Sequence, residues 1–114
     1  MKKSLDIVLP VYNEESILHR NVSIILEFIK NNLESYQTNI IIIDNGSTDS
    51  TYKIASQLTK SNPNIKAKKI ETKGRGIALK TAWTESFSDL LVYMDIDLST
   101  DISSLKSLIY EIDF

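Results

Sequence analysis

A run of four isoleucines, Ile40–Ile43, constrains the fold of this chain more than any other feature. A strand with one solvent-exposed face alternates apolar and polar residues, and this run does not alternate. The run is therefore typical of a central strand in a parallel sheet that is covered on both faces. Three more runs have the length and composition of strands: Leu5–Leu9, Ile65–Ile70 and Leu90–Met94.

The segment between the first two runs predicts an amphipathic helix. Its apolar residues recur at the 3.6-residue period of a helix: Leu18, Val22, Ile25 and Ile29. Asn13 is the predicted N-cap, and the carboxylates of Glu14 and Glu15 suit the positive end of the helix dipole. The helix is predicted to end at Asn31 and Asn32.

Three further helices are expected. The second begins near Asp49 and ends at Asn62–Pro63, because the residue before a proline disfavours the helical conformation. The third begins near Gly76, and the fourth follows Thr100 or Asp101. Strands and helices then alternate along the chain. This order predicts an α/β fold, with a Rossmann-like parallel sheet of about four strands and helices on both of its faces.

Length, charge and composition exclude several classes of protein. The chain has 114 residues, which suffice for one domain. Its net charge of -2 gives no electrostatic basis for binding nucleic acid. The absence of cysteine removes disulfides and thiolate chemistry and fits a reducing compartment. The apolar start before Pro10 is too short for a signal peptide, so we expect a cytoplasmic protein.

Polar and charged residues follow each predicted strand. The four loops are Pro10–Glu15, Asp44–Asp49, Thr72–Gly76 and Asp95–Asp97. The carboxyl ends of parallel strands meet at one edge of the sheet, which is where open α/β sheets bind ligands. Together the loops offer carboxylates for a hard cation, cations for a diphosphate, and an acid and an amide for a base or sugar. This combination suits a nucleoside diphosphate with a divalent ion.

Each loop also has a purely structural interpretation. Asp44–Ser47 fits a turn that caps the next helix, and Asn13–Glu14 fits a helix start. Lys73–Gly76 fits a basic turn and matches neither the dinucleotide fingerprint nor the P-loop. Asp95 and Asp97, taken alone, fit the end of a strand. The functional interpretation therefore depends on the four loops meeting at one edge.

Four motifs resemble those of the family 2 glycosyltransferases of the GT-A fold. In chain order they are Val8–Glu15, Ile43–Thr51, Lys73–Gly76 and Tyr93–Thr100. The resemblance is greatest to the dolichyl-phosphate glucosyl- and mannosyltransferase branch, and it extends over nearly the whole chain. It covers only the nucleotide-binding half of the family domain. Where the family often has Asp-Asp-Gly-Ser, Asp44–Ser47 reads Asp-Asn-Gly-Ser, which leaves the role of the second position open.

The resemblance implies a role for each matching residue on the nucleoside side of the site. Pro10, Tyr12 and Glu14 would line the nucleoside pocket, with Glu14 near the base or the ribose. Asp44 would hydrogen-bond the base.

On the diphosphate side, the resemblance implies two cations and two acids. Lys73 and Arg75 would approach the nucleotide or its diphosphate. Asp95 would contact the ribose or a metal-bound water and belongs to the implied metal site. Asp97 would bind Mg²⁺ or Mn²⁺, which makes it the implied catalytic residue.

The same resemblance implies that the protein would be an inverting glycosyltransferase that takes a sugar from a UDP- or GDP-linked donor. The implied acceptor class is a polyprenyl phosphate such as dolichyl phosphate, met by a peripheral protein at a membrane surface. Residues 1–114 would be the donor-binding part of a truncated GT-A domain. An alternative is a non-catalytic module that binds a nucleotide or nucleotide sugar and lacks an acceptor site. A second alternative is a flavodoxin-like or receiver-type signalling domain. Receivers need an acid at the end of the third strand, and the third predicted strand ends here in Ile70-Glu71-Thr72-Lys73, which disfavours this alternative.

The fourth predicted strand raises the question of its neighbours. Leu90–Met94 is strongly apolar, and only one predicted helix follows it. An exposed apolar strand edge is a pairing hazard. We therefore expect that this strand either joins further sequence or pairs with another copy of the chain.

Overall fold

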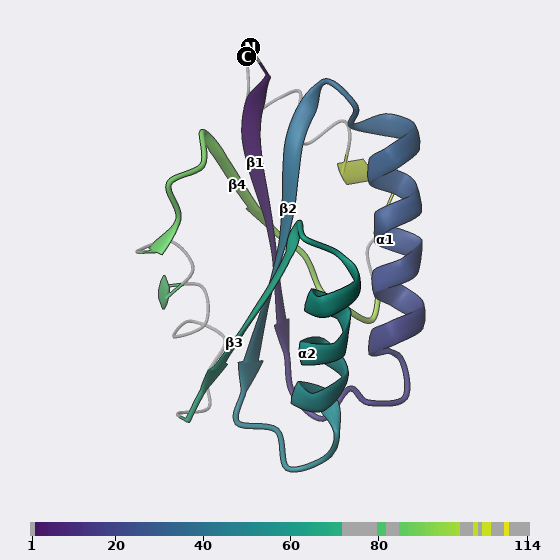
Figure 1. Cartoon of the computed structure of the whole chain (residues 1–114), viewed down its shortest axis with the longest axis vertical. Helices are drawn as coiled ribbons and strands as arrows, with labels where there is room; N and C mark the ends of the chain where they lie inside the picture. The colour runs from purple at the N-terminus through teal and green to yellow at the C-terminus, as the bar shows by residue number, and fades with distance from the viewer. Residues whose placement is uncertain are drawn as a thin grey trace.

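The protein forms a four-stranded parallel sheet with helices against it (Figure 1). The computed structural model describes residues 2–71, 80–81, 85–98, 102, 104, 105 and 109. The elements in chain order are β1 (Lys3–Val11), α1 (Leu18–Asn32), β2 (Tyr36–Asn45), α2 (Thr51–Ser61), β3 (Ile65–Ile70) and β4 (Leu90–Tyr93). The predicted α/β class, the parallel pairing and the four strands are confirmed.

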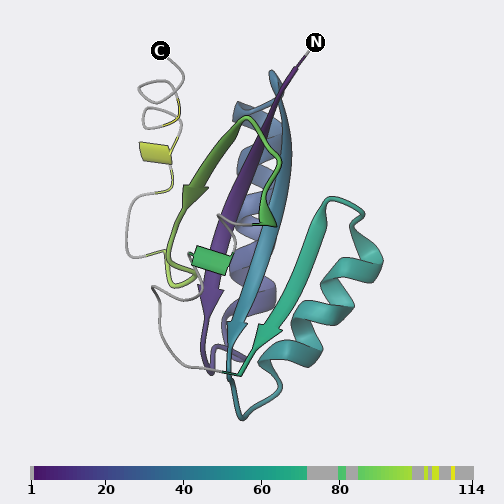
Figure 2. The same ribbon diagram turned by 90° about the vertical axis from the view of Figure 1, so that its left-hand side faces the viewer.

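The strand order is β3-β2-β1-β4, so the chain changes direction once within the sheet. From β1 it moves outward through α1, β2 and α2 to β3, and it then returns to the opposite side of β1 to form β4. Helices α1 and α2 lie side by side on one face, and the view from the β4 side shows α1 behind the sheet (Figure 2). The strand order therefore reverses between β1 and β4, and the carboxyl ends of two such strands flank the point where open α/β sheets have a ligand-binding crevice.

The two faces of the sheet are packed unequally. The main core lies against α1 and α2 and takes alternate residues of the central strands: Leu5, Ile7, Leu9, Val11, Ile40 and Ile42. The opposite face carries a smaller cluster around Val8 and Ile43, against which the half-buried Ile41 packs. Ile40 and Ile42 therefore lie in the main core beneath the helices, whereas Ile41 and Ile43 belong to the smaller cluster on the opposite face.

Strands β1 and β2 are longer than predicted, and this corrects the assignment of Pro10, Asp44 and Asn45 to loops. Proline is tolerated in β1 because of the strand order. The Val8 carbonyl accepts a hydrogen bond from the Met94 N–H, so every second residue of β1 points its backbone toward β4. Pro10 points the same way, beyond the end of the β4 ladder, and its missing N–H costs no ladder bond.

The first helix begins later than predicted. It starts at Leu18, with Ile17 as its N-cap, so the prediction of Asn13 as the N-cap is wrong. The Glu14 carbonyl starts the helix by accepting the N–H groups of Ile17 and Leu18. Asn13 instead has a φ of 51° and bonds to the loop after β2. Helix α2 and its end before Asn62–Pro63 agree with the prediction.

Parts of the predicted third and fourth helices lie outside the described residues. Lys80, Thr81 and Glu85 are helical, and an ion pair joins Glu85 to Lys68 of β3. Leu105 and Ile109, from the segment predicted as the fourth helix, are buried in the core that contains α1. β4 is an edge of the described sheet, and its pairing with another chain stays a prediction.

Gly46 occupies a position that a residue with a side chain fills only under strain. Its φ is 78°, and a Cβ there would lie 3.3 Å from the Glu71 carbonyl oxygen. We expect Gly46→Ala to lower the free energy of unfolding by about 1–3 kcal/mol. Gly46→Asn is the matched control, because asparagine tolerates positive φ better, and it should lose less. Urea denaturation measures both, and an equal loss for the two variants would show that crowding alone decides.

Candidate functional site

An open cleft of about 310 Å³ lies at the carboxyl ends of β1, β2 and β4. Of the residues predicted from sequence, five line it: Pro10, Tyr12, Glu14, Asp95 and Asp97. They come from the first and fourth predicted loops, which are separated along the chain by α1, β2, α2, β3 and β4. The structure thus brings the first and fourth loops together at the crevice between β1 and β4.

Of the other predicted residues that the structure describes, Asp44 does not line the cleft. Asp44 is fully buried at the end of β2, and Lys73 and Arg75 lie outside the described residues. The lining residue from β2 is Asn45. Sequence reasoning left the role of Asn45 open. The signal that could have found it is strand alternation, which puts Asn45 on the same face as Ile43.

Among the described residues, only one of the two Asp44 carboxylate oxygens accepts hydrogen bonds. Its Oδ1 accepts hydrogen bonds from the Ser47 hydroxyl and, at 3.3 Å, from the Ser47 N–H. Its Oδ2 is buried and has no hydrogen-bond partner among the described residues. A buried carboxylate oxygen without a donor is costly, so Asp44 has the capacity to accept one more hydrogen bond.

Carboxylates dominate the charge of the cleft. Glu14, Asp95 and Asp97 line it, and no basic side chain is among its described lining residues. Burial raises the pKa of Glu14 above its usual value of 4.5, and the charges of Asp97 and Asp49 raise that pKa further. Like charges held this close are relieved by a cation, and hard carboxylate oxygens are suitable ligands for Mg²⁺ or Mn²⁺.

The turn after β4 fixes the two aspartates of the cleft. The Ile96 side chain between them is only 2% exposed and packs into the core against α1. The Leu98 N–H donates to the Asp95 carbonyl at 3.1 Å, and Leu98 has a φ of 56°. With Ile96 held inside, Asp95 is half-buried and Asp97 is exposed at the cleft.

Hydrogen bonds join the loop after β1 to the loop after β2. The Asn13 N–H donates to the Ser47 hydroxyl at 2.8 Å, and the Thr48 N–H donates to Asn13 Oδ1 at 2.9 Å. The Glu14 N–H donates to the Thr51 hydroxyl at 2.9 Å. These bonds hold the backbone on both sides of Glu14. Sequence reasoning assigned Asn13 and the residues after Asp44 to local capping and turns, so it missed the bonds between the two loops.

Asp49 and Glu15 complete this connection. Asp49 accepts hydrogen bonds from the Thr51 hydroxyl, from the Thr51 N–H at 2.9 Å and from the Glu15 N–H at 3.4 Å. Glu15 in turn accepts from the Ser50 N–H at 3.0 Å. Burial acts to raise the pKa of Asp49, but the hydrogen bonds from Thr51 and Glu15 outweigh it and hold that pKa below the usual 3.8.

The lowered pKa of Asp49 predicts a pH dependence of stability. A carboxylate whose pKa is depressed by folding stabilises the protein above its unfolded pKa of about 3.9 and loses this effect as pH falls through the folded value. We expect Asp49→Asn to make the acid-side decline of stability shallower. Urea midpoints from neutral pH to below pH 3 measure this. The exposed Glu34→Gln is the control, and parallel curves for wild type and Asp49→Asn would contradict the prediction.

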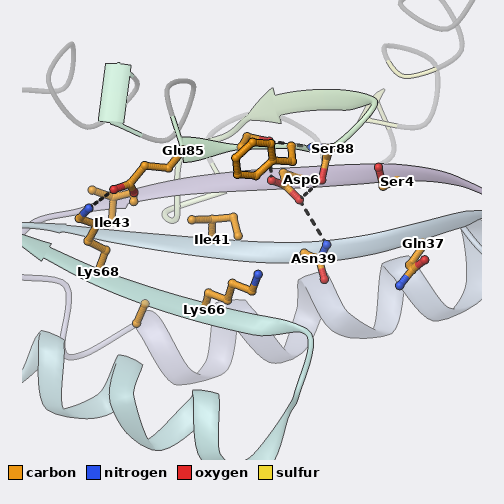
Figure 3. Close-up of a pocket in the computed structure, with 13 residues that line it drawn as sticks. Ser4, Asp6, Gln37, Asn39, Ile41, Ile43, Lys66, Lys68, Glu85 and Ser88 are labelled. Atoms are coloured by element: carbon orange, nitrogen blue, oxygen red, sulfur yellow. Dashed lines mark hydrogen bonds and ion pairs between the residues drawn. The ribbon is translucent and has the colours of Figure 1, made fainter.

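A second cavity, of about 380 Å³, lies on the face of the sheet opposite α1 and α2 (Figure 3). It is larger than the cleft, and it lies over the face formed by β1, β2 and β3 and not at the carboxyl ends of the strands. Its buried carboxylate, Asp6, accepts hydrogen bonds from Asn39 at 3.3 Å, Ser86 at 2.7 Å and Ser88 at 2.6 Å. Since Asp6 is already satisfied by the protein, the cleft is the better candidate for a ligand site.

The chain is similar in sequence to known glycosyltransferases. Residues 6–114 match the model of the family "Glycosyl transferase family 2". The chain is 32% identical over 106 residues to "Glycosyltransferase AglD" of Haloferax volcanii, which covers 92% of the chain and 17% of that protein. It is 30% identical over 112 residues to "Dolichyl-phosphate beta-glucosyltransferase ALG5A" of Trichomonas vaginalis, which covers 95% of the chain and 35% of that protein. The chain thus spans about a third or less of these relatives.

Two solved structures share the fold. A mannosyltransferase, PcManGT from Pyrobaculum calidifontis in complex with GDP-Man and Mn²⁺, matches with a TM-score of 0.71 at 21% identity, over 85% of this chain and 28% of that one. S. aureus TarS in complex with UDP matches with a TM-score of 0.68 at 21% identity, over 97% of this chain and 32% of that one. Among the described residues, no helix is long and apolar enough to cross a membrane. The family match over residues 6–114 shows that the chain belongs to glycosyl transferase family 2.

Proposed function

We propose that the cleft binds the nucleoside diphosphate part of a sugar donor together with a divalent cation, as the donor site of a glycosyltransferase. The observation that carries this proposal is the position of Asp95 and Asp97, which line a cleft at the crevice between β1 and β4. Open α/β sheets bind ligands at such crevices. The family of the chain and the nucleotides in the two related structures support the same function.

The residues of the cleft fit a cation that is shared with a ligand. Among the described residues, no group of three or more His, Cys, Asp or Glu side chains forms a metal site. Mg²⁺ is commonly held by one or two carboxylates, while substrate phosphates and waters complete its coordination. Asp95 and Asp97 supply that number. The cation would neutralise charge that develops on the departing diphosphate.

The nucleoside would lie against the other side of the cleft. Pro10 and Tyr12 offer apolar surface there. The proposed hydrogen bond from the base to Asp44 requires that its buried Oδ2 becomes exposed. Lys73 and Arg75 would contact the diphosphate, as cations beside an anionic leaving group. Asn45 is a further candidate contact, because it lines the same cleft.

The proposed reaction is an inverting sugar transfer. An acceptor oxygen attacks the anomeric carbon, a new glycosidic bond forms, and the bond to the nucleoside diphosphate breaks. A polyprenyl phosphate is the proposed acceptor class, supported by the relative named as a dolichyl-phosphate glucosyltransferase. Such an acceptor is already anionic near neutral pH, so it needs little help from a general base. The proposed setting is the cytoplasmic surface of a membrane.

The test of this function separates binding from turnover. We expect the 114-residue chain to bind UDP or GDP only when Mg²⁺ or Mn²⁺ is present, as measured by isothermal titration calorimetry. We also expect negligible hydrolysis or transfer by this chain alone. Free labelled sugar measures hydrolysis, and labelled sugar attached to a polyprenyl phosphate measures transfer. Metal-independent binding, or no binding, would overturn the donor site. Robust transfer would show that these residues suffice for the acceptor as well.

A further inference from the structure

Helix α1 carries one polar side chain in its buried stripe. Its buried residues are Leu18, Asn21, Val22 and Ile25. Asn21 is 4% exposed, and it follows Leu18 by three residues, so it occupies a position where the helical period calls for an apolar side chain. A buried amide is stable only if it is hydrogen-bonded, which directs attention to its partner.

The partner of Asn21 is the turn that carries the two cleft aspartates. Asn21 Nδ2 donates to the Ile96 carbonyl oxygen at 2.7 Å, and this bond is buried. Ile96 is the residue between Asp95 and Asp97, and it lies 75 residues further along the chain. On its other side, Asn21 Oδ1 accepts a long hydrogen bond of 3.5 Å from Arg20 Nε.

We propose that Asn21 is a positioning residue, which holds the Asp95–Asp97 turn in the orientation that the diphosphate and its cation require. The inference rests on the proposed function of the cleft. A hydrogen bond to the Ile96 carbonyl fixes the plane of the peptide between Ile96 and Asp97. The direction in which the Asp97 side chain leaves the backbone follows from that plane.

The same part of α1 also holds the opposite side of the cleft. The Glu14 carbonyl accepts the first N–H groups of the helix, from Ile17 and Leu18, and the Asn21 N–H donates to the Ile17 carbonyl. One stretch of helix therefore connects the backbone of Glu14 to the backbone of Ile96. Through Asn21, α1 sets the separation of the two sides of the cleft.

Asn21→Leu tests the proposal, because leucine has a similar volume and no hydrogen-bond donor. The matched control is Asn32→Leu. Asn32 lies at the far end of the same helix, roughly 16 Å away, and its amide donates to the Phe28 carbonyl at 3.1 Å. We expect Asn21→Leu to bind UDP with Mg²⁺ roughly tenfold more weakly in calorimetry, and Asn32→Leu to bind like wild type. Wild-type affinity for Asn21→Leu, or an equal loss for Asn32→Leu, would overturn the proposal.

A measurement on the wild-type chain does not depend on the variant folding. We expect the Asn21 side-chain amide resonances to shift when UDP and Mg²⁺ are added, while those of Asn32 stay unchanged. Unchanged Asn21 resonances under saturating ligand would overturn the proposal.

A ligand-free comparison separates this inference from the proposed function. In folded Asn21→Leu without ligand, we expect the backbone amide resonances of Asp97 and Leu98 to move from their wild-type positions. If wild type binds no nucleotide but these resonances move, the donor site fails and the positioning of the turn stands. If wild type binds and these resonances stay in place, the donor site stands and the positioning fails.

Discussion

Asp97→Ala is expected to abolish the metal-dependent part of nucleotide binding. At ligand concentrations of about 100 times the dissociation constant, binding stabilises a folded protein by about 2.7 kcal/mol. Wild type should therefore melt several degrees higher with UDP or GDP and Mn²⁺ than with either alone. In Asp97→Ala this extra stabilisation should disappear, because the remaining cleft carboxylates cannot hold the cation against the diphosphate. Thermal melts with nucleotide, metal, both and neither measure the difference.

Glu34→Ala is the control for this substitution. Glu34 is exposed in the turn before β2, at the opposite end of that strand from the carboxyl-end cleft, and its removal changes net charge by the same amount. It should keep the full metal-dependent stabilisation. If Asp97→Ala retains that stabilisation as well, Asp97 is not the metal ligand. If both variants lose it, general electrostatic attraction rather than a specific ligand accounts for the binding.

Ile42→Ala is expected to be far more destabilising than Ile41→Ala, although the two residues are adjacent and identical. Ile42 is completely buried between the sheet and the helices, so its truncation should cost about 2–5 kcal/mol in the free energy of unfolding. Ile41 is half-buried and borders the 380 Å³ cavity of the opposite face, so its truncation should cost about half as much or less. Urea denaturation of both variants measures the difference.

The comparison also tests the assignment of the two faces. A total stability of about 5–15 kcal/mol is usual for a domain, so the loss in Ile42→Ala is a large and readily measured fraction of the total. Equal losses would mean that the face bearing Ile41 is as closely packed as the face bearing Ile42.

The elements of the fold were largely predictable from the sequence. Runs such as Ile65–Ile70 and the helical period after Leu18 are local signals, and they gave the strands and helices nearly in place. The ends were less predictable. Asn13 has the composition of an N-cap, but its backbone conformation and its bonds to Ser47 and Thr48 depend on a loop more than 30 residues away.

Much of the candidate site was predictable for a related reason. Polar residues at the ends of parallel strands share one edge whatever the strand order, so Pro10, Glu14 and Asp97 were expected to be neighbours. The strand order decides which loops face each other, and it selected the first and fourth. Asn21 could not be recognised, since a single amide in the apolar stripe of a helix becomes meaningful only when its partner across the fold is known.

The sequence by itself determined the class of fold, the family and the types of residue at the carboxyl edge, because periodicity and motifs are properties of neighbours along the chain. The tertiary structure alone decided which face of Ile40–Ile43 forms the closed core. It also decided that β4 lies beside β1. That neighbour relation creates the crevice and brings the Asp95–Asp97 turn within hydrogen-bond reach of α1. These features depend on contacts between segments far apart in the chain, and no local pattern encodes them.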